Sequence, residues 1–239
     1  IAMGKKDNAI FLDTATLEIY FISGMEIMMS QLKCDFKVVG PVQTNCYFLS
    51  NTDTRECVIV DPGEEAGNIA DFIEKKELKP VAILLTHGHF DHIGAVDEIR
   101  NRYGIKVYAA AAEKETLENP DINLSSQFGS GYTVKADEFL NDGQEIELLG
   151  EKVRCLLTPG HTKGGMCYYF TGSGILFSGD TLFQQSVGRT DFPGGSMGEI
   201  VRSIREKLFV LPDYVRVYTG HGMMTNIKDE KMLNPFAVE

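Results

Sequence analysis

The chain has 239 residues, of which 43% are hydrophobic, and a formal net charge of −11. This length and composition allow one sizeable buried core and give no reason to expect disorder. The acidic balance argues against a nucleic-acid-binding surface, which needs clustered Lys and Arg, and it is adequately explained by solubility.

The N-terminal segment, residues 1–28, is predicted to be a variable extension or a leader added to the natural chain, ahead of one domain over residues 29–239. Its apolar stretch is interrupted by Asp13, Glu18 and Glu26. It also lacks the cationic start and small-residue cleavage site of a signal peptide. No segment of the chain reaches the ~20 uninterrupted apolar residues of a membrane span, so we expect no membrane association.

The first part of the domain alternates strands and helices. Strand patterns occur in "FKVVGPVQTNCYFLSN" and "ECVIVDPG", and apolar residues at helical spacing over 66–73 predict an amphipathic helix that ends before Pro80. The continuous apolar run "VAILL" (81–85) is typical of a strand buried on both faces. Helical spacing returns from His92 to Tyr103, and "IKVYAA" has strand character.

Residues 111–136 are predicted to be irregular, with "NPDINLSSQFGSGY" (119–132) as a long surface loop that either only connects its neighbours or shapes substrate access. Strands resume in "QEIELLG", "EKVRCLLT", "MCYYFTG" and "GILFSGD". A helix from Ser196 to about Phe209 begins with a capping box of Ser196 and Glu199, and "VRVYTGHG" is the last strand. Two batches of strands with interleaved helices predict one layered α/β domain.

Every histidine of the chain lies at the end of a predicted strand. The motif "THGHFDH" supplies His87, His89 and His92, "TPGHT" supplies His161, and "TGHG" supplies His221. A fourth strand end, "SGDT", carries Asp180 instead. A lone histidine is more often a hydrogen-bonded core or surface residue, but H-x-H-x-D-H with three partners in matching positions is far more specific.

The spacing predicts a centre with two metal ions. His87 and His89 point the same way along an extended chain and can hold one ion, whereas Asp91 and His92 lie at the turn into a helix and can face a second. Seven candidate ligands are too many for one four-coordinate ion and suit two, with Asp180 able to bridge them. None of the five cysteines lies in a motif, which argues against a structural zinc site.

On these motifs and their order, residues 30–239 resemble the metallo-β-lactamase superfamily. The resemblance implies a four-layer αβ/βα sandwich in a single α/β domain, with the metal ions at one edge. It implies that the first ion is held by His87, His89 and His161, that the second is held by Asp91, His92 and His221, and that Asp180 bridges both.

The stretch "FSGDTLFQQSVGRTDFPGGS" is similar to the glyoxalase II branch, the hydroxyacylglutathione hydrolases, and the tail "NIKDEKMLNPF" resembles short bacterial members. The resemblance implies hydrolysis of small thioesters such as S-D-lactoylglutathione by a metal-bridging hydroxide, with Asp91 as a catalytic group that orients the nucleophile or moves its proton. β-Lactam hydrolysis is not expected, because zinc β-lactamases generally lack the aspartate supplied here by Asp180. The alternatives are a mononuclear iron persulfide dioxygenase, a lactonase, or a protein of this fold without catalysis.

Four further residues are candidates for supporting the ligands. Asp61 either holds a ligand histidine by its other ring nitrogen or caps the turn before Pro62. Thr86 and Thr162 flank ligands, and Arg189 pairs with a carboxylate of the site or, as a purely structural ion pair, with Asp191.

The expected cofactors are two divalent metal ions, with zinc first and iron or manganese as alternatives. The expected partner is a small-molecule thioester, with no nucleic acid and no membrane; the sequence leaves the oligomeric state open. Five cysteines without regular spacing predict reduced thiols, and therefore a cytoplasmic protein.

Overall fold

The first sheet orders the N-terminal half of the domain. The computed structural model describes residues 31–129 and 131–237, so the predicted leader over residues 1–28 lies outside the described residues. Six strands lie in chain order, and they are β1 Leu32–Val39, β2 Thr44–Asn51, β3 Glu56–Val60, β4 Lys79–Leu84, β5 Lys106–Ala110 and β6 Glu138–Leu140. The pairs β1–β2 and β2–β3 are antiparallel, and the pairs from β3 to β6 are parallel.

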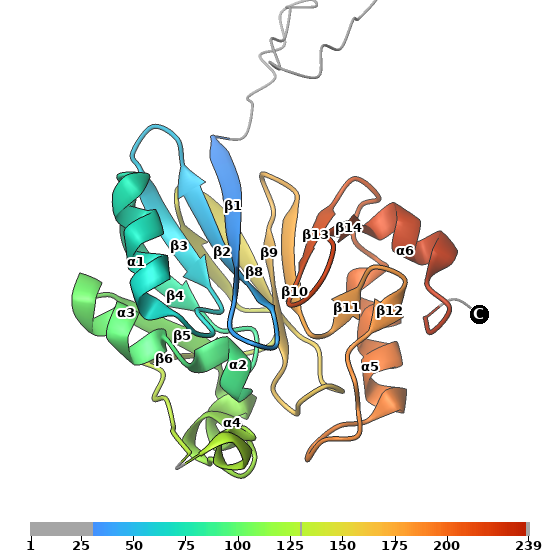
Figure 1. Cartoon of the computed structure of the whole chain (residues 1–239). Coiled ribbons are helices and arrows are strands. Elements are labelled where there is room, and N and C mark those ends of the chain that lie inside the picture. Colours follow the sequence, from blue (N-terminus) through green and yellow to red (C-terminus); the bar gives the residue numbers. More distant parts are fainter. Residues whose placement is uncertain (1–30, 130, 238–239) are drawn as a thin grey trace, which may run out of the picture. The chain divides into compact units, whose positions relative to one another are not determined.

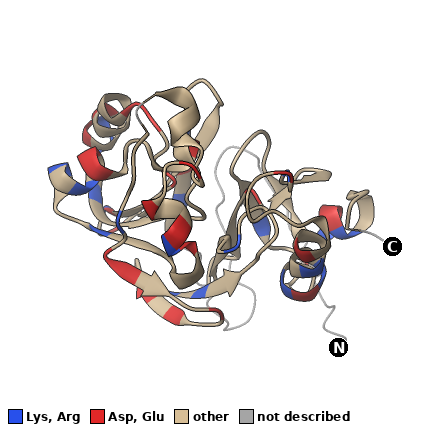
Figure 2. Cartoon of the chain, turned by 90° about the horizontal axis from the view of Figure 1, so that it is seen from below, with Lys and Arg blue, Asp and Glu red and all other residues tan. Residues whose placement is uncertain are grey.

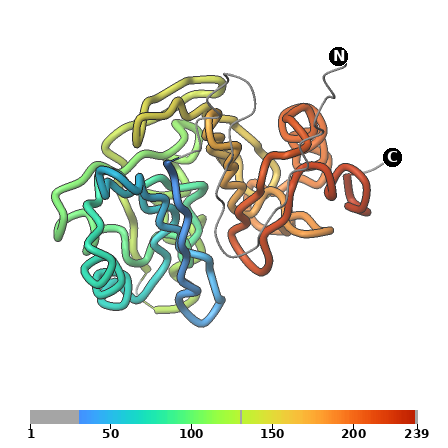
Figure 3. The backbone as a smooth tube through the Cα atoms, turned by 90° about the horizontal axis from the view of Figure 1, so that it is seen from above, coloured from blue at the N-terminus to red at the C-terminus, as the bar shows by residue number. Residues whose placement is uncertain are grey.

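The second sheet is built from the C-terminal half and has the order β14-β13-β10-β9-β8-β7. Its strands are β7 Glu145–Leu148, β8 Glu151–Leu157, β9 Met166–Phe170, β10 Ile175–Gly179, β13 Arg216–Thr219 and β14 Thr225–Asn226. A small hairpin of β11 (Leu182–Phe183) and β12 (Ser186–Val187) follows β10. In Figure 3 the blue and green segments gather on the left and the orange and red segments on the right.

Helices cover the outer face of each sheet, which gives the predicted four layers (Figure 1). The first sheet carries α1 (Ala66–Lys75) and α3 (Val96–Tyr103), and the second carries α5 (Met197–Ser203), the π-helical turn η3 (Ile204–Leu208) and α6 (Ile227–Leu233). In the described part of the chain, no helix is both long enough and apolar enough to cross a membrane.

Three buried clusters correspond to the three interfaces between these layers. Ile69, Ile73 and Ile99 of the helices pack on the first sheet, and Ile200 and Ile204 pack on the second. Between the sheets lies a cluster rich in aromatic rings from both, namely Tyr47, Tyr168, Phe170, Phe177 and Tyr218. Each sheet is therefore covered on both faces, which is why central strands such as β2, β9 and β10 are buried along their whole length.

The structure confirms the longer predicted elements and corrects two details. The helix expected from His92 to Tyr103 is broken into α2 (Phe90–Ile93) and α3, because the Ala95 backbone N–H donates to the Pro62 carbonyl at 3.0 Å and so leaves the helical hydrogen-bond ladder. The segment 111–136, predicted as an irregular loop, contains η1 (Ala111–Glu113), α4 (Lys114–Glu118) and η2 (Ser125–Phe128). Several of its side chains are buried, so it packs as part of the domain.

Candidate metal centre

The sheet topology brings the candidate ligands to one edge. The strands β8, β10 and β13 run in the same direction, since β8 and β10 are each antiparallel to β9, and β10 is parallel to β13. Their carboxyl ends are followed by His161, Asp180 and His221 respectively. In the first sheet the parallel strands β3 and β4 lead to Asp61 and to the "THGHFDH" motif, which runs into α2.

One group of ligand atoms consists of His87, His89 and His161, whose candidate atoms all lie within 4.8 Å of one another. The Nδ1 atom of His89 lies 2.9 Å from Nε2 of His161, and all three side chains are buried. Within the described residues, Nε2 of His87 and Nε2 of His89 have no hydrogen-bond partner. Buried polar atoms without partners are costly, and a metal ion would satisfy them.

A second group consists of Asp91, His92 and His221. The Nε2 atom of His221 lies 3.2 Å from Oδ2 of Asp91 and 3.3 Å from Nε2 of His92. A third group, His87, His92 and Asp180, overlaps both of the others.

Asp180 lies between the two groups. Its Oδ2 atom is 3.6 Å from Nε2 of His161 and 3.5 Å from Nε2 of His221, and its Oδ1 atom is 3.4 Å from Nε2 of His92. Asp180 thus has its two oxygens near histidines of both groups, the position that a bridging carboxylate requires.

The electrostatics of these groups suit cations. Burial lowers the pKa of His89 to about 3 and that of His87 well below its usual range, so both imidazoles are neutral, the form that binds metal ions. Burial by itself raises the pKa of Asp91, but His92 and His221 lower it to about 2. Burial also acts to raise the pKa of Asp180, but His92 outweighs it and holds this pKa well below its usual range. Burial lowers the pKa of His92 and His221, but the carboxylates of Asp91 and Asp180 outweigh it and raise the pKa of both rings, so metal ions would displace protons from them. Ionised carboxylates and imidazole nitrogens together form a donor set that fits divalent ions.

Asp61 contacts the candidate ligand His92 and, through Thr86, the start of the motif. Oδ1 of Asp61 accepts a hydrogen bond from the Thr86 backbone N–H at 2.8 Å, and Oδ2 accepts one from the Thr86 hydroxyl at 2.6 Å. The same Oδ2 lies 3.0 Å from Nδ1 of His92. Asp61 is therefore placed to orient this ring by its other nitrogen, the first of the two roles considered from the sequence.

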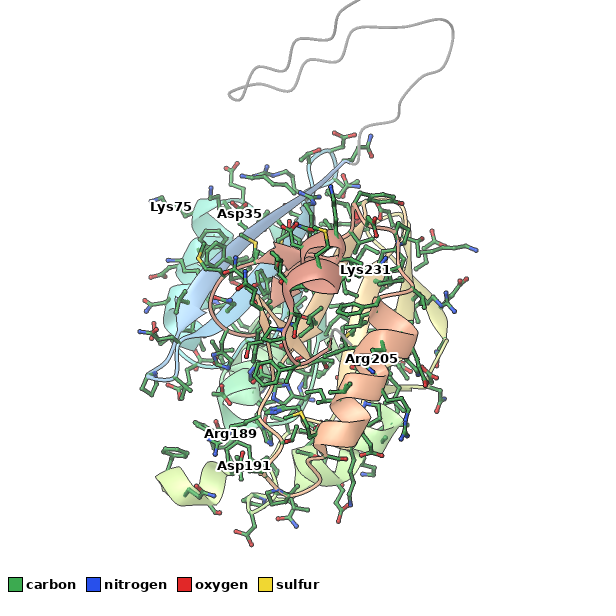
Figure 4. The ribbon with its side chains drawn as sticks, turned by 90° about the vertical axis from the view of Figure 1, so that its right-hand side faces the viewer. Asp35, Lys75, Arg189, Asp191, Arg205 and Lys231 are labelled. Carbon is green, nitrogen blue, oxygen red and sulfur yellow. The ribbon has the colours of Figure 1, made fainter. Side chains whose placement is uncertain are left out.

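Arg189 supports the site through its backbone. Its carbonyl oxygen lies 2.7 Å from Nδ1 of His161. Its guanidinium pairs with Asp191 at 2.8 and 2.7 Å and lies over the ring of Phe192, 3.9 Å from the centroid. The two charged side chains lie together in Figure 4. The structure thus places the Arg189 side chain in the pair with Asp191, one of the two predicted partners.

The Thr162 hydroxyl donates to the buried carboxylate of Glu113 at 2.9 Å, and not to a ring of the candidate ligands. Glu113 was not singled out in the sequence, because no motif surrounds it. Thr44 was missed for the same reason, although its hydroxyl donates to Oδ2 of Asp91 at 2.9 Å. Gln43 contributes only its backbone carbonyl, 3.3 Å from Nδ1 of His221.

Aromatic rings border the ligand groups. Phe192 lies against His89 with ring centroids 5.5 Å apart, and Phe183 lies 6.2 Å from His221. Phe90, inside the motif, stacks on Phe128 at 4.3 Å, and the Tyr132 hydroxyl donates to the Phe90 carbonyl at 2.6 Å. Apolar rings thus border both candidate ligand groups, beside the polar partners described above.

Comparisons with known proteins agree with this geometry. Residues 39–221 match the family model of the metallo-beta-lactamase superfamily. A probable metallo-hydrolase of Bacillus subtilis, YqgX, is 43% identical over 200 residues, covering 83% of this chain and 94% of the relative. The hydroxyacylglutathione hydrolase GloC of Haemophilus influenzae is 35% identical over 204 residues, covering 83% and 94% respectively.

Solved structures give the same result. The BLEG-1 B3 metallo-beta-lactamase superposes with a TM-score of 0.82 at 41% identity, over 87% of this chain and 100% of that one. The protein TTHA1623, in a di-iron-bound form, superposes with a TM-score of 0.75 at 33% identity, over 84% and 99%. ETHE1 from Myxococcus xanthus superposes with a TM-score of 0.71 at 27% identity, over 86% and 84%. The chain therefore belongs to the metallo-beta-lactamase superfamily and is a metal-dependent hydrolase by family.

Proposed function

We propose that the protein is a binuclear metal-dependent hydrolase of small thioesters, with S-D-lactoylglutathione as the first substrate to test. The observation that carries the proposal is the pair of complete ligand groups that meet at Asp180. The similarity to GloC, a hydroxyacylglutathione hydrolase, supports the choice of substrate.

Each of the two ligand groups would hold one ion. The first ion would be held by His87, His89 and His161, and the second by Asp91, His92 and His221. When bound, two divalent ions would lower the pKa of a water between them and polarise a substrate carbonyl. Zinc is our first choice, and the di-iron form of TTHA1623 makes iron the principal alternative.

Asp91 is the residue proposed to handle the proton of the attacking water. Its Oδ2 is fixed by the Thr44 hydroxyl at 2.9 Å and lies 3.2 Å from Nε2 of His221. Its Oδ1 makes none of these contacts. A carboxylate held by one oxygen leaves the other available to accept a proton or to orient the nucleophile.

The neighbouring rings would position the substrate. Phe192 lies beside His89 of the first ligand group, and Phe183 lies beside His221 of the second. Such rings exclude water beside the reacting carbonyl and offer apolar contact to the acyl group or the thiol carrier. The chemistry of a thioester fits, because a thiolate leaves readily without strong acid assistance.

β-Lactam hydrolysis is the second candidate, and it has one specific observation in its favour. The BLEG-1 neighbour, at 41% identity, is a B3 metallo-beta-lactamase. The presence of Asp180 among the ligands favours thioester hydrolysis, so the two substrates have to be compared directly.

We further propose a cytoplasmic location and no nucleic-acid partner. All five cysteines are free, as expected in a reducing compartment. On the face seen in Figure 2, Lys and Arg are interspersed with Asp and Glu, whereas nucleic-acid binding needs a basic patch.

The deciding experiment measures hydrolysis of S-D-lactoylglutathione and of a chromogenic cephalosporin by protein of known metal content, with and without chelator. Turnover of the thioester that chelator abolishes and added metal restores would support the proposal. Faster turnover of the cephalosporin would favour the second candidate. Consumption of oxygen with a glutathione persulfide, by protein containing a single iron, would contradict hydrolysis and support the dioxygenase.

A further inference from the structure

Glu113 is a buried carboxylate that joins the two loops carrying the first ligand group. It is 1% exposed and ends the short helix η1. Its Oε1 accepts a hydrogen bond from the backbone N–H of Gly88 at 2.9 Å, and its Oε2 accepts one from the Thr162 hydroxyl at 2.9 Å. Gly88 lies between the first two histidines of that group, and Thr162 directly follows the third.

Two further donors complete the surroundings of this carboxylate. Burial raises the pKa of the Glu113 carboxyl, and the Thr116 side chain and the Gly164 backbone N–H, like the first two donors, oppose this rise. A buried carboxylate with this many donors is fixed in orientation, since each hydrogen bond to a charged acceptor is stronger than a neutral one. Glu113 therefore acts as a rigid connection between backbone segments that are far apart in the sequence.

The same segment packs closely against both loops, with no space for a side chain at Gly164 and little at Gly88. A Cβ at Gly164 would lie 2.3 Å from the Glu113 backbone nitrogen and 2.5 Å from its Oε2. A Cβ at Gly88 would lie 3.1 Å from the Leu117 backbone nitrogen. One glycine in each ligand loop thus permits the close approach of Ala111–Glu118.

From this arrangement we infer that Glu113 is a positioning residue for the ion held by His87, His89 and His161. It sets the separation of the two loops, and with it the distance between their histidines, without touching a ligand ring. The second group, with Asp91, His92 and His221, has no hydrogen bond to Glu113 among the described contacts. The inference rests on the proposed two-metal centre.

The test is the Glu113→Gln variant, because glutamine keeps the shape but replaces one acceptor oxygen by a donor amide that opposes the Gly164 N–H. Metal-free protein is titrated with Zn²⁺ against a competing chelator, and Co²⁺ loading is followed by its visible spectrum. We expect one dissociation constant to rise about 10–100-fold and the other to stay at the wild-type value. We also expect the spectrum of only one Co²⁺ equivalent to change.

Two further variants complete the design. Glu118→Gln, in the adjacent helix α4 and paired with Lys114 at the surface, is the matched control and should behave as wild type. Thr162→Val removes a single donor to Glu113 and should weaken binding of the same ion. Thr162→Ser keeps the hydroxyl and should bind that ion as tightly as wild type. If Glu113→Gln does not fold, Thr162→Val decides, and unchanged constants in that variant would overturn the inference.

A role in folding alone has a different signature. In that case Glu113→Gln would lower the unfolding temperature of the metal-free protein while both dissociation constants stayed at wild-type values, and the inference would be wrong. Equal weakening of both ions would also contradict it. If wild-type protein itself bound fewer than two ions, the two-metal proposal would fail independently of the variants.

Discussion

The support of His92 by Asp61 yields a prediction whose size follows from the contacts. In Asp61→Asn, the amide oxygen can replace Oδ1 and still accept from the Thr86 N–H. The amide nitrogen then takes the place of Oδ2, 3.0 Å from Nδ1 of His92, where a ring N–H also donates. The ring either loses this bond or moves its proton to Nε2, the atom that faces Asp91, Asp180 and His221.

Either result weakens metal binding. Loss of a partner that orients a ligand histidine costs about 10–100-fold in metal affinity, which corresponds to about 1.4–2.7 kcal/mol. Metal-free protein loses a hydrogen bond to a charged acceptor, so its free energy of unfolding should fall by about 1–3 kcal/mol. Backbone strain adds little, since Asp61 has a φ of 50°, which asparagine also tolerates.

Chelator competition gives the affinity, and denaturant unfolding of the metal-free protein gives the stability. Asp71→Asn, on the exposed side of α1, is the control for loss of a charge and should match wild type in both measurements. An Asp61→Asn protein that binds both ions as tightly as wild type would refute the role of Asp61 in orienting His92.

Three further predictions concern the ligands, the thiols and the C-terminal helix. Asp180→Ala and His161→Ala should each lower turnover by at least about a hundredfold, because metal ions stabilise the transition state by several kcal/mol. Circular dichroism should show that the fold is retained. Near-normal turnover would contradict the two-metal account. Burial raises the pKa of Cys167 to about 11, so at pH 8 only about one thiol in a thousand is ionised. The thiol is neutral below this pKa, and its reactivity therefore rises only as the pH approaches 11. A thiol reagent at pH 8 should therefore label Cys167 slowly in native protein and rapidly in denaturant, and fast native labelling would be inconsistent with this burial. Glu230→Ala should lower the free energy of unfolding of the domain by about 2–3 kcal/mol in denaturant unfolding. The buried carboxylate accepts from the Gln185 N–H at 2.9 Å, and its loss leaves that donor unpaired. An unchanged unfolding midpoint would show that water replaces the carboxylate.

The candidate ligands could be expected to lie together from the sequence because their motifs follow apolar strand patterns, and the structure does bring them together. Parallel strands place their carboxyl ends at one edge of a sheet. If the strands are predicted correctly, they therefore bring together the motif "THGHFDH" and the residues His161, Asp180 and His221. The long strands and the helix over 66–73 carry strong periodicity and were predicted well. The family resemblance is confirmed by the match over residues 39–221.

What could not be predicted depends on contacts between distant segments. Glu113 lies in a segment without periodicity, and only the folded chain brings it to Gly88 and Thr162. The contact of Arg189 with His161 uses a backbone carbonyl, which any residue would supply, so the side chain gives no signal. Strands of two residues, such as β11 and β12, are too short to show an alternating pattern.

The central claim, that two ions bound by these groups carry out hydrolysis, is tested most directly by adding Zn²⁺ stepwise to metal-free protein. Bound metal and turnover of S-D-lactoylglutathione are measured at each step. We predict that turnover rises until two ions are bound and that Asp180→Ala, which lacks the shared ligand, never reaches this level. Full turnover with a single bound ion, or turnover unaffected by metal removal, would contradict the account.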